Sequence, residues 1–218
     1  MHSVNSRNLI RILTPTRLSS YRTCDGIDIL ENYAYNIKLA ESLYPALNLL
    51  EVTLRNNICY AIESLIKKEW LISEYSNQQI LGNKEYQKVK EAVNSINKQG
   101  KKLTNDRLVA EMTFGFWIHL CTKVYKPKFW DKKGFFELVF PNYQSKTGLR
   151  QISPIQNDLR IILRLRNRIF HHEIITNGKI TPATHYQIIQ NLIHLMSDDM
   201  VQFLDEVSRF PDVVKQKP

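Results

Sequence analysis

The sequence predicts an all-helical protein that folds as one bundle. Apolar residues recur at helical spacing along most of the chain, no segment shows the alternation typical of a strand, and no repeat or glycine-rich nucleotide-binding motif occurs. The 218 residues are enough for one well-buried core, and 43% of them are hydrophobic, as in globular proteins. We expect an N-terminal arm over 1–16, a helical domain over 17–209 and a C-terminal tail over 210–218.

The first half of the chain predicts two helices separated at Pro45. Residues 28–43 and 45–68 each carry apolar side chains on one face. Proline disfavours a helix interior because it lacks the backbone N–H and crowds the preceding turn. In the second helix, Glu51 and Arg55 are four residues apart and therefore share a face. They either form an ordinary solvated pair or face a functional site.

The rest of the helical pattern is more interrupted. Residues 74–83 are polar and predict a loop, followed by a charged helix over 84–98 with Gly100 in the left-handed conformation at its end. Apolar spacing then predicts a helix over 104–124 and a last one over 181–209.

A segment rich in lysine and aromatic residues, 125–143, allows two interpretations. Its aromatic rings could stack on nucleic-acid bases while the lysines hold phosphates. Alternatively, Phe129, Trp130 and Phe136 anchor a loop in the core.

The net charge of +9 favours a polyanionic partner, with nucleic acid the first candidate. Lysine and arginine are spread through the chain, so the charge alone also fits a protein that is simply soluble.

Cysteine spacing and hydropathy argue against several other classes of protein. Cys24, Cys59 and Cys121 are far apart and predict reduced thiols, with no metal-ligand spacing and no metal or other cofactor. No apolar run is long enough for a membrane helix or a secretory signal. We therefore expect a cytoplasmic protein with no membrane partner.

The most informative segment is Ser153–Glu173, which predicts an amphipathic helix. Ser153 can cap its first turn, and Pro154 fits the first helical position. Arg166 falls near the middle of the apolar stripe, where a charge is costly unless it snorkels, pairs with a carboxylate or borders a site. The stripe comprises Leu159, Ile162, Leu163, Ile169 and Phe170. A ridge of polar residues on the adjoining face comprises Arg160, Arg164, Asn167 and His171.

The end of this helix carries a recognisable motif. Arg166 is followed by the polar Asn167 and, after three more residues, by His171, which resembles the ribonuclease motif of HEPN domains. The longer string, RNR-x-x-HHE, resembles the Abi-like family of abortive-infection proteins, of the AbiD/AbiF type. Three further strings are similar to signatures of that family: RL..Y from Arg17, LLE..LRN around Glu51, and E..FGFW..L before residue 121.

The resemblance implies a metal-independent endoribonuclease of phage defence, abortive or toxin-like. Histidine can transfer a proton at the 2′-hydroxyl of RNA, while arginine holds the phosphate, so the expected product ends are a 2′,3′-cyclic phosphate and a 5′-hydroxyl. By this resemblance His171 transfers the proton, Arg166 clamps the phosphate and Asn167 orients the substrate or His171. Secondary candidates are Arg168, His172, Glu173, Glu51 and Arg55, and the expected RNA-binding residues are Arg160 and Arg164.

The motif has a geometric difficulty. In a continuous helix Arg166 and His171 point about 140° apart. Either the helix unwinds near Phe170, or a homodimer combines the two residues from different subunits.

Two other functions fit the same residues. One is a HEPN-type helical module without nuclease activity that binds RNA or a protein. The other is a helical scaffold whose basic ridge pairs with an acidic, antitoxin-like regulatory protein.

Overall fold

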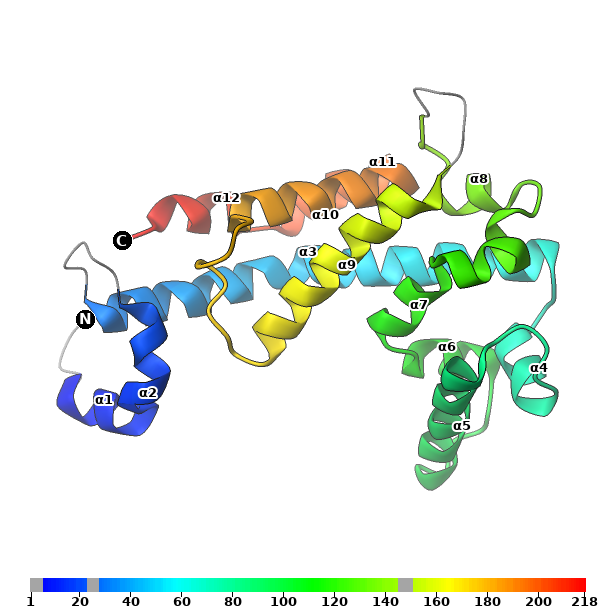
Figure 1. Cartoon of the computed structure of the whole chain (residues 1–218), viewed down its shortest axis with the longest axis horizontal. Helices are drawn as coiled ribbons and strands as arrows, with labels where there is room; N and C mark the ends of the chain where they lie inside the picture. Colours follow the sequence, from blue (N-terminus) through cyan, green and yellow to red (C-terminus); the bar gives the residue numbers. More distant parts are fainter. Residues whose placement is uncertain (1–5, 23–27, 145–150) are drawn as a thin grey trace.

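The computed structural model describes residues 6–22, 28–144 and 151–218, and every regular element in these ranges is helical (Figure 1). The predicted all-α class is confirmed. No helix in the described ranges is both long enough and apolar enough to cross a lipid bilayer. The axis of the bundle is α3 (Ile29–Leu65), which contacts helices from both halves of the chain. Around it pack α7 (Phe114–Leu120), α8 (Phe135–Val139), α10 (Pro182–Met196), α11 (Asp198–Val207) and α12 (Phe210–Val213).

Pro45 does not interrupt α3, so the predicted division into two helices is wrong. The proline leaves the Glu41 carbonyl without its helical hydrogen bond, which is a local cost. Packing outweighs that cost, because buried side chains on both sides of the proline fix the helix against its neighbours. These side chains are Leu43, Ala46, Leu47 and Leu50. The helix ends at Leu65, earlier than predicted.

Two helices predicted as continuous are each divided. Within 104–124, Met112 leaves the helical conformation and separates α6 (Asn105–Glu111) from α7. Within 181–209, Ser197 ends α10, and its hydroxyl caps the first turn of α11. The apolar face continues on both sides of each break, so periodicity does not reveal it. A serine inside such a pattern can cap a new helix instead of continuing the old one.

The segment 74–83, predicted as a loop, begins inside a short helix, α4 (Trp70–Ser76). Glu74 on this helix is buried, and its carboxylate accepts three backbone N–H groups of the following turn at 2.8 to 3.3 Å. The turn leads into α5 (Asn83–Lys98), which confirms the predicted charged helix, and Gly100 beyond it has the predicted positive φ of 65°. The residues that donate to Glu74 are Gln79, Ile80 and Leu81.

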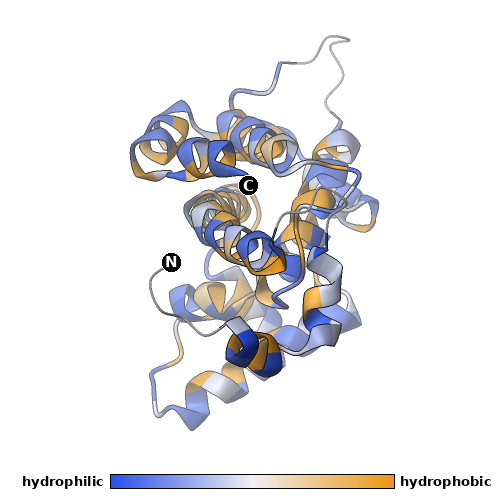
Figure 2. Ribbon diagram, turned by 90° about the vertical axis from the view of Figure 1, so that its left-hand side faces the viewer, coloured by the Kyte–Doolittle hydropathy of each residue, from blue (hydrophilic) through white to orange (hydrophobic). Residues whose placement is uncertain are grey.

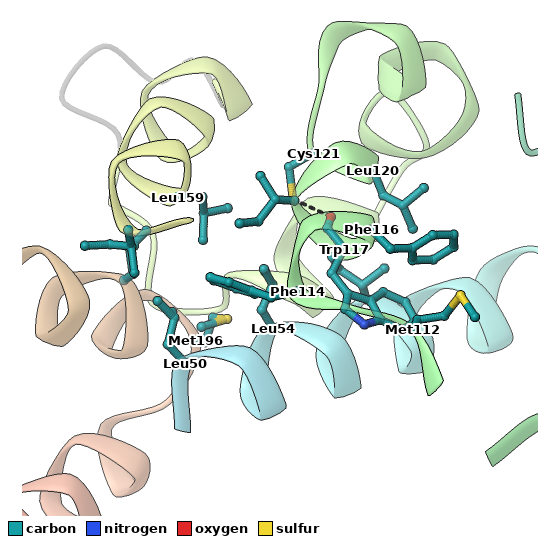
Figure 3. Close-up of a cluster of buried hydrophobic side chains, with 14 of the residues drawn as sticks. Leu50, Leu54, Met112, Phe114, Phe116, Trp117, Leu120, Cys121, Leu159 and Met196 are labelled. Atoms are coloured by element: carbon teal, nitrogen blue, oxygen red, sulfur yellow. Dashed lines mark hydrogen bonds between the residues drawn. The ribbon is translucent and has the colours of Figure 1, made fainter. Parts of the chain in front are cut away.

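The core is rich in aromatic rings where α7 faces α3 (Figure 3). Phe116 and Trp117 meet edge to face with ring centroids 5.1 Å apart. Phe129, Trp130 and Phe136 are buried nearby, which confirms the core-anchoring interpretation of their segment. Two irregular turns carry that segment, η2 (Lys123–Tyr125) and η3 (Lys126–Trp130). Around each helix hydrophobic and hydrophilic positions occupy different sides, as amphipathic packing requires (Figure 2).

The described cysteines are buried, as predicted for structural thiols. Burial raises the pKa of Cys59 to about 12 and raises that of Cys121 as well, so neither is a reactive thiolate near neutral pH. Cys24 lies outside the described residues.

The N-terminal arm contains more helix than expected. It consists of α1 (Ser6–Leu13), α2 (Pro15–Leu18) and η1 (Ser19–Tyr21). Thr14 joins the first two with a positive φ of 64°, and its hydroxyl accepts the backbone N–H of Arg17 at 3.4 Å. The arm formed by these elements, residues 6–21, extends beyond the expected range of 1–16. At the other end of the chain, the expected tail begins in α12 with Phe210, whose buried ring stacks on Tyr186.

Candidate functional site

The motif lies at the end of α9 (Ile152–Phe170), which crosses the bundle in front of α3 in Figure 1. Ser153 does not cap this helix; it lies inside the first turn, and Gln151 takes the cap position without a side-chain hydrogen bond. The apolar face of α9 is buried as far as Leu165 against α7 and α10. The last turn then leaves the core, so the half-buried Arg166 borders a pocket.

The first of two pockets beside this last turn is the helix pocket, a hollow of about 230 Å³ between α3 and α9. The Arg166 guanidinium lies over the Phe170 ring, 4.3 Å from its centroid, in a cation–π contact. Of the described residues, Arg166 is among the few with a buried nitrogen, its Nε, that has no hydrogen-bond partner. The helix pocket is lined by Tyr44, Leu47, Asn48, Glu51, Val52, Arg55, Arg166 and Phe170.

The helix pocket has charges of both signs. Burial raises the pKa of the half-buried Glu51, while the positive charges of Arg166 and Arg55 and the Phe114 backbone N–H act in the opposite direction. The Arg55 Nε donates to the side chain of Asn56 at 3.2 Å. Glu51 and Arg55 therefore line the same pocket as Arg166.

The end of α9 is a Schellman motif, which places His171 and His172 outside the helix. The N–H of Glu173 bonds the Arg168 carbonyl at 2.8 Å, and the N–H of His172 bonds the Ile169 carbonyl at 3.0 Å. His172 has a positive φ of 56°, a conformation that costs energy for any residue except glycine. His171 is the cap residue, and its side chain is exposed.

His171 lines the second pocket, the arm pocket, an open hollow of about 700 Å³ between the arm and the loop after α9. Arg17 brings a second basic group into it, and its guanidinium donates to the His172 carbonyl at 2.6 Å. The other lining residues are Ile12, Leu13, Thr14, Thr16, Ser20, Tyr21, Arg168, His172, Glu173 and Ile174.

A buried asparagine on α3 joins the two sides of the arm pocket. The Asn36 amide donates to the Tyr21 hydroxyl and to the Glu173 carbonyl, both at 3.3 Å. Its side-chain oxygen accepts the N–H of Ile175 at 2.9 Å. Asn36 is only 5% exposed, so these bonds are shielded from water. A further bond, from Asn177 to the Ser20 carbonyl at 3.3 Å, ties the loop to the arm.

Arg168 and Glu173 stabilise the loop after α9. The Arg168 guanidinium donates to the Ile174 carbonyl, and its Nε lies 3.7 Å from the Glu173 carboxylate. Glu173 thus contacts Arg168 through its side chain and does not orient either histidine. Both residues line the arm pocket, but their contacts stabilise the loop after α9.

The structure does not bring Arg166 and His171 together within one chain. They line different pockets that share no lining residue. The helix ends at Phe170, where one of the two explanations expected it to unwind, but this end leaves His171 in a different pocket from Arg166. Asn167, four residues before His171, is exposed on the same face. The expected RNA-binding residues Arg160 and Arg164 are exposed along α9.

Sequence reasoning missed three residues of these pockets. Arg17 lines the arm pocket, the buried Asn36 supports it through hydrogen bonds to Tyr21 and Glu173, and the exposed Tyr44 lies at the helix pocket. Arg17 was noticed only as part of a family-like string. Tyr44 could have been found from the sequence, because its large ring falls on the solvent side of a helix and outside the apolar stripe.

No group of three or more histidine, cysteine, aspartate or glutamate side chains suited to a metal ion occurs in the part of the chain that the structure describes. Comparisons of this chain with protein-family models, with curated proteins and with solved structures found no match.

Proposed function

We propose that the protein is a HEPN-type, Abi-like endoribonuclease of phage defence that cleaves RNA without a metal ion. The observation that carries the proposal is the arm pocket, where the exposed His171 opens into a hollow beside the Arg17 guanidinium. An imidazole and a guanidinium in one hollow can serve phosphodiester transfer within RNA, because RNA supplies its own nucleophile.

The reaction needs one base and one acid. A base removes the proton from the 2′-hydroxyl, the 2′-oxygen forms a bond to phosphorus, and the bond from phosphorus to the 5′-oxygen breaks as an acid donates a proton to that oxygen. The products are a 2′,3′-cyclic phosphate and a 5′-hydroxyl. In each site a single His171 would act as the base, and solvent water would donate the proton to the leaving 5′-oxygen.

A homodimer would explain how Arg166 and His171 can act together although they are separated within one chain. Arg166 of one subunit would clamp the phosphate while His171 of the other transfers the proton, so the helix pocket of each subunit would face the arm pocket of its partner.

The test is an RNA cleavage assay in excess EDTA with analysis of the product ends. Cleavage that persists in chelator, leaves cyclic phosphate ends and disappears in His171→Ala supports the proposal. Activity that is lost in EDTA and restored by a divalent metal contradicts it.

A second candidate is a HEPN-type module that binds RNA or a protein partner without cutting RNA. The separation of Arg166 from His171 within one chain favours this candidate if the protein is monomeric. If the intact protein binds RNA and does not cleave it, this second candidate is favoured. Expression of the protein should then leave cell growth unaffected.

A further inference from the structure

The proposed function uses Arg166 of the helix pocket but leaves its other polar side chains unexplained. Glu51 is a half-buried carboxylate, which accepts hydrogen bonds and cannot donate them when ionised. Arg55 and Arg166 have N–H groups and can only donate. All three line a hollow of about 230 Å³, so acceptor and donor groups surround one small space.

The arginines have nitrogen atoms left for a ligand. Arg55 donates through Nε to Asn56, which leaves its terminal nitrogens for other partners. Arg166 stacks over Phe170, and its buried Nε has no partner among the described residues. That Nε is closed to solvent, so a ligand in the pocket would bond the terminal nitrogens of Arg166 and Arg55.

Aromatic rings supply a flat surface at the same pocket. Tyr44 comes from α3 and is 58% exposed, while Phe170 comes from α9 and is 51% exposed. Both rings line the pocket, where a planar ligand can stack on them. The pocket is smaller than those that hold drug-sized molecules, which fits one ring system.

We propose that the helix pocket binds the guanine base of an RNA strand. Guanine has two adjacent donors, N1–H and the N2 amine, which match the two oxygens of the Glu51 carboxylate. It also has two adjacent acceptors, O6 and N7, which match an arginine fork. Adenine and cytosine each have one amine, and uracil has none, so guanine alone offers paired donors to a carboxylate. Tyr44 stacks on the base.

This assignment deepens the proposed function and rests on it. A base in the helix pocket lies beside Arg166, which is the expected phosphate clamp. The enzyme would therefore cut RNA next to a guanosine, and Glu51 would determine the preference.

The test uses an uncleavable 2′-O-methyl RNA heptamer with a single central guanine, and the same strand with adenine or inosine there. Fluorescence anisotropy should show tighter binding to guanine by roughly 5- to 150-fold, the equivalent of ~1–3 kcal/mol for a two-bond contact. Inosine lacks the N2 amine and should lose most of this preference. Glu51→Gln should abolish the preference, because its amide places a donor against a donor.

Matched controls separate the pocket from general surface effects. Tyr44→Ala should weaken binding to the guanine strand, and Tyr60→Ala should not, although Tyr60 is also on α3 and is 63% exposed. Phe170→Ala should also weaken binding, whereas Phe203→Ala, at a ring that is 49% exposed on α11, should not.

Equal affinity for the guanine and adenine strands would overturn the guanine assignment while the ribonuclease proposal stands. The assignment also fails if Tyr44→Ala turns a dimer into a monomer and leaves the base preference unchanged, since a second copy would then cover the pocket. The last measurement uses free GMP as the ligand. If GMP binds in a Glu51-dependent manner and no strand binds or is cut, the guanine site stands and the ribonuclease proposal falls.

Discussion

The two pockets beside the last turn of α9 are held together in different ways. The helix pocket is formed by side chains of two helices, so helix packing alone fixes its shape. The arm pocket depends on hydrogen bonds between segments far apart in the sequence, such as Arg17 with the His172 carbonyl and Asn36 with Ile175. We infer that substitutions in the helix pocket change binding while leaving the fold intact, whereas substitutions that support the arm pocket change stability and activity together.

The largest expected effect is in the arm pocket. His171→Ala should lower the rate of RNA cleavage by about 10²- to 10⁴-fold, the usual contribution of a general acid or base. The matched control is His172→Gly, because the adjacent histidine lines the same pocket but has the left-handed conformation that suits glycine. Equal loss of activity in both variants would show that the loop, and not the imidazole of His171, matters.

In the helix pocket, substitution of Arg166 should lower the rate of RNA cleavage without unfolding the protein. Arg166→Ala should reduce cleavage by about 100-fold or more, as expected for loss of a group that stabilises transition-state charge. Arg166→Lys should restore little, because lysine lacks the fork that holds two phosphate oxygens. A lysine variant with full activity would indicate that Arg166 serves only to pack on Phe170.

Stability should distinguish the two pockets further. Asn36→Ala should lower the free energy of unfolding by roughly 1–3 kcal/mol, because the buried Tyr21 hydroxyl and Ile175 N–H lose their partner. Asn57→Ala is the control, since the Asn57 side chain makes one hydrogen bond within the described residues, to the Val139 carbonyl at 3.0 Å. Urea unfolding that shows equal losses would contradict a special role for Asn36.

A smaller effect of opposite sign is expected at the end of α9. His172→Gly should stabilise the protein by about 1 kcal/mol, because a left-handed conformation costs roughly 1–2 kcal/mol in a residue with a Cβ. Part of this gain is offset by the greater freedom of glycine in the unfolded chain. Thermal unfolding of the variant measures the change, and a marked loss of stability would mean that the His172 side chain makes contacts that hold the loop.

The pH dependence of stability should report on Glu51. Burial raises its pKa above the ordinary value of 4.5, so the folded protein favours the protonated acid. The stability from this group is fully present below the unfolded pKa and is lost as the pH rises through the folded pKa. Glu51→Gln should therefore gain stability relative to the parent as the pH rises from acid to neutral. A gain that does not change with pH would contradict the raised pKa.

The sequence was a good guide to which segments are helical and a poor guide to where helices break. Apolar periodicity correctly marked the segments around α5 and α9, because each buries one face. It failed at Pro45, where burial on both sides keeps α3 continuous, and at Ser197, where the serine starts a new helix. In both places contacts from other parts of the chain decide the outcome, and a local pattern does not contain them.

The candidate site was only partly predictable from the sequence. The position of Arg166 on the apolar face left the border of a site as one of three interpretations, and the spacing of Glu51 and Arg55 placed them on one face of α3 without showing that this face meets Arg166. The arm pocket was not predictable, because Arg17 reaches the end of α9 across 155 residues of sequence. The Schellman motif was hidden too, since its left-handed position is occupied by a histidine, where glycine is usual.

The most direct test of the account mixes two inactive variants. Arg166→Ala and His171→Ala proteins are each assayed for RNA cleavage alone and then after mixing, with sedimentation used to establish the oligomeric state. If each site takes Arg166 from one subunit and His171 from the other, mixed dimers retain one intact site and the mixture regains part of the parent activity. If the mixture stays inactive, or if the parent protein cuts RNA as a monomer, the shared site is wrong.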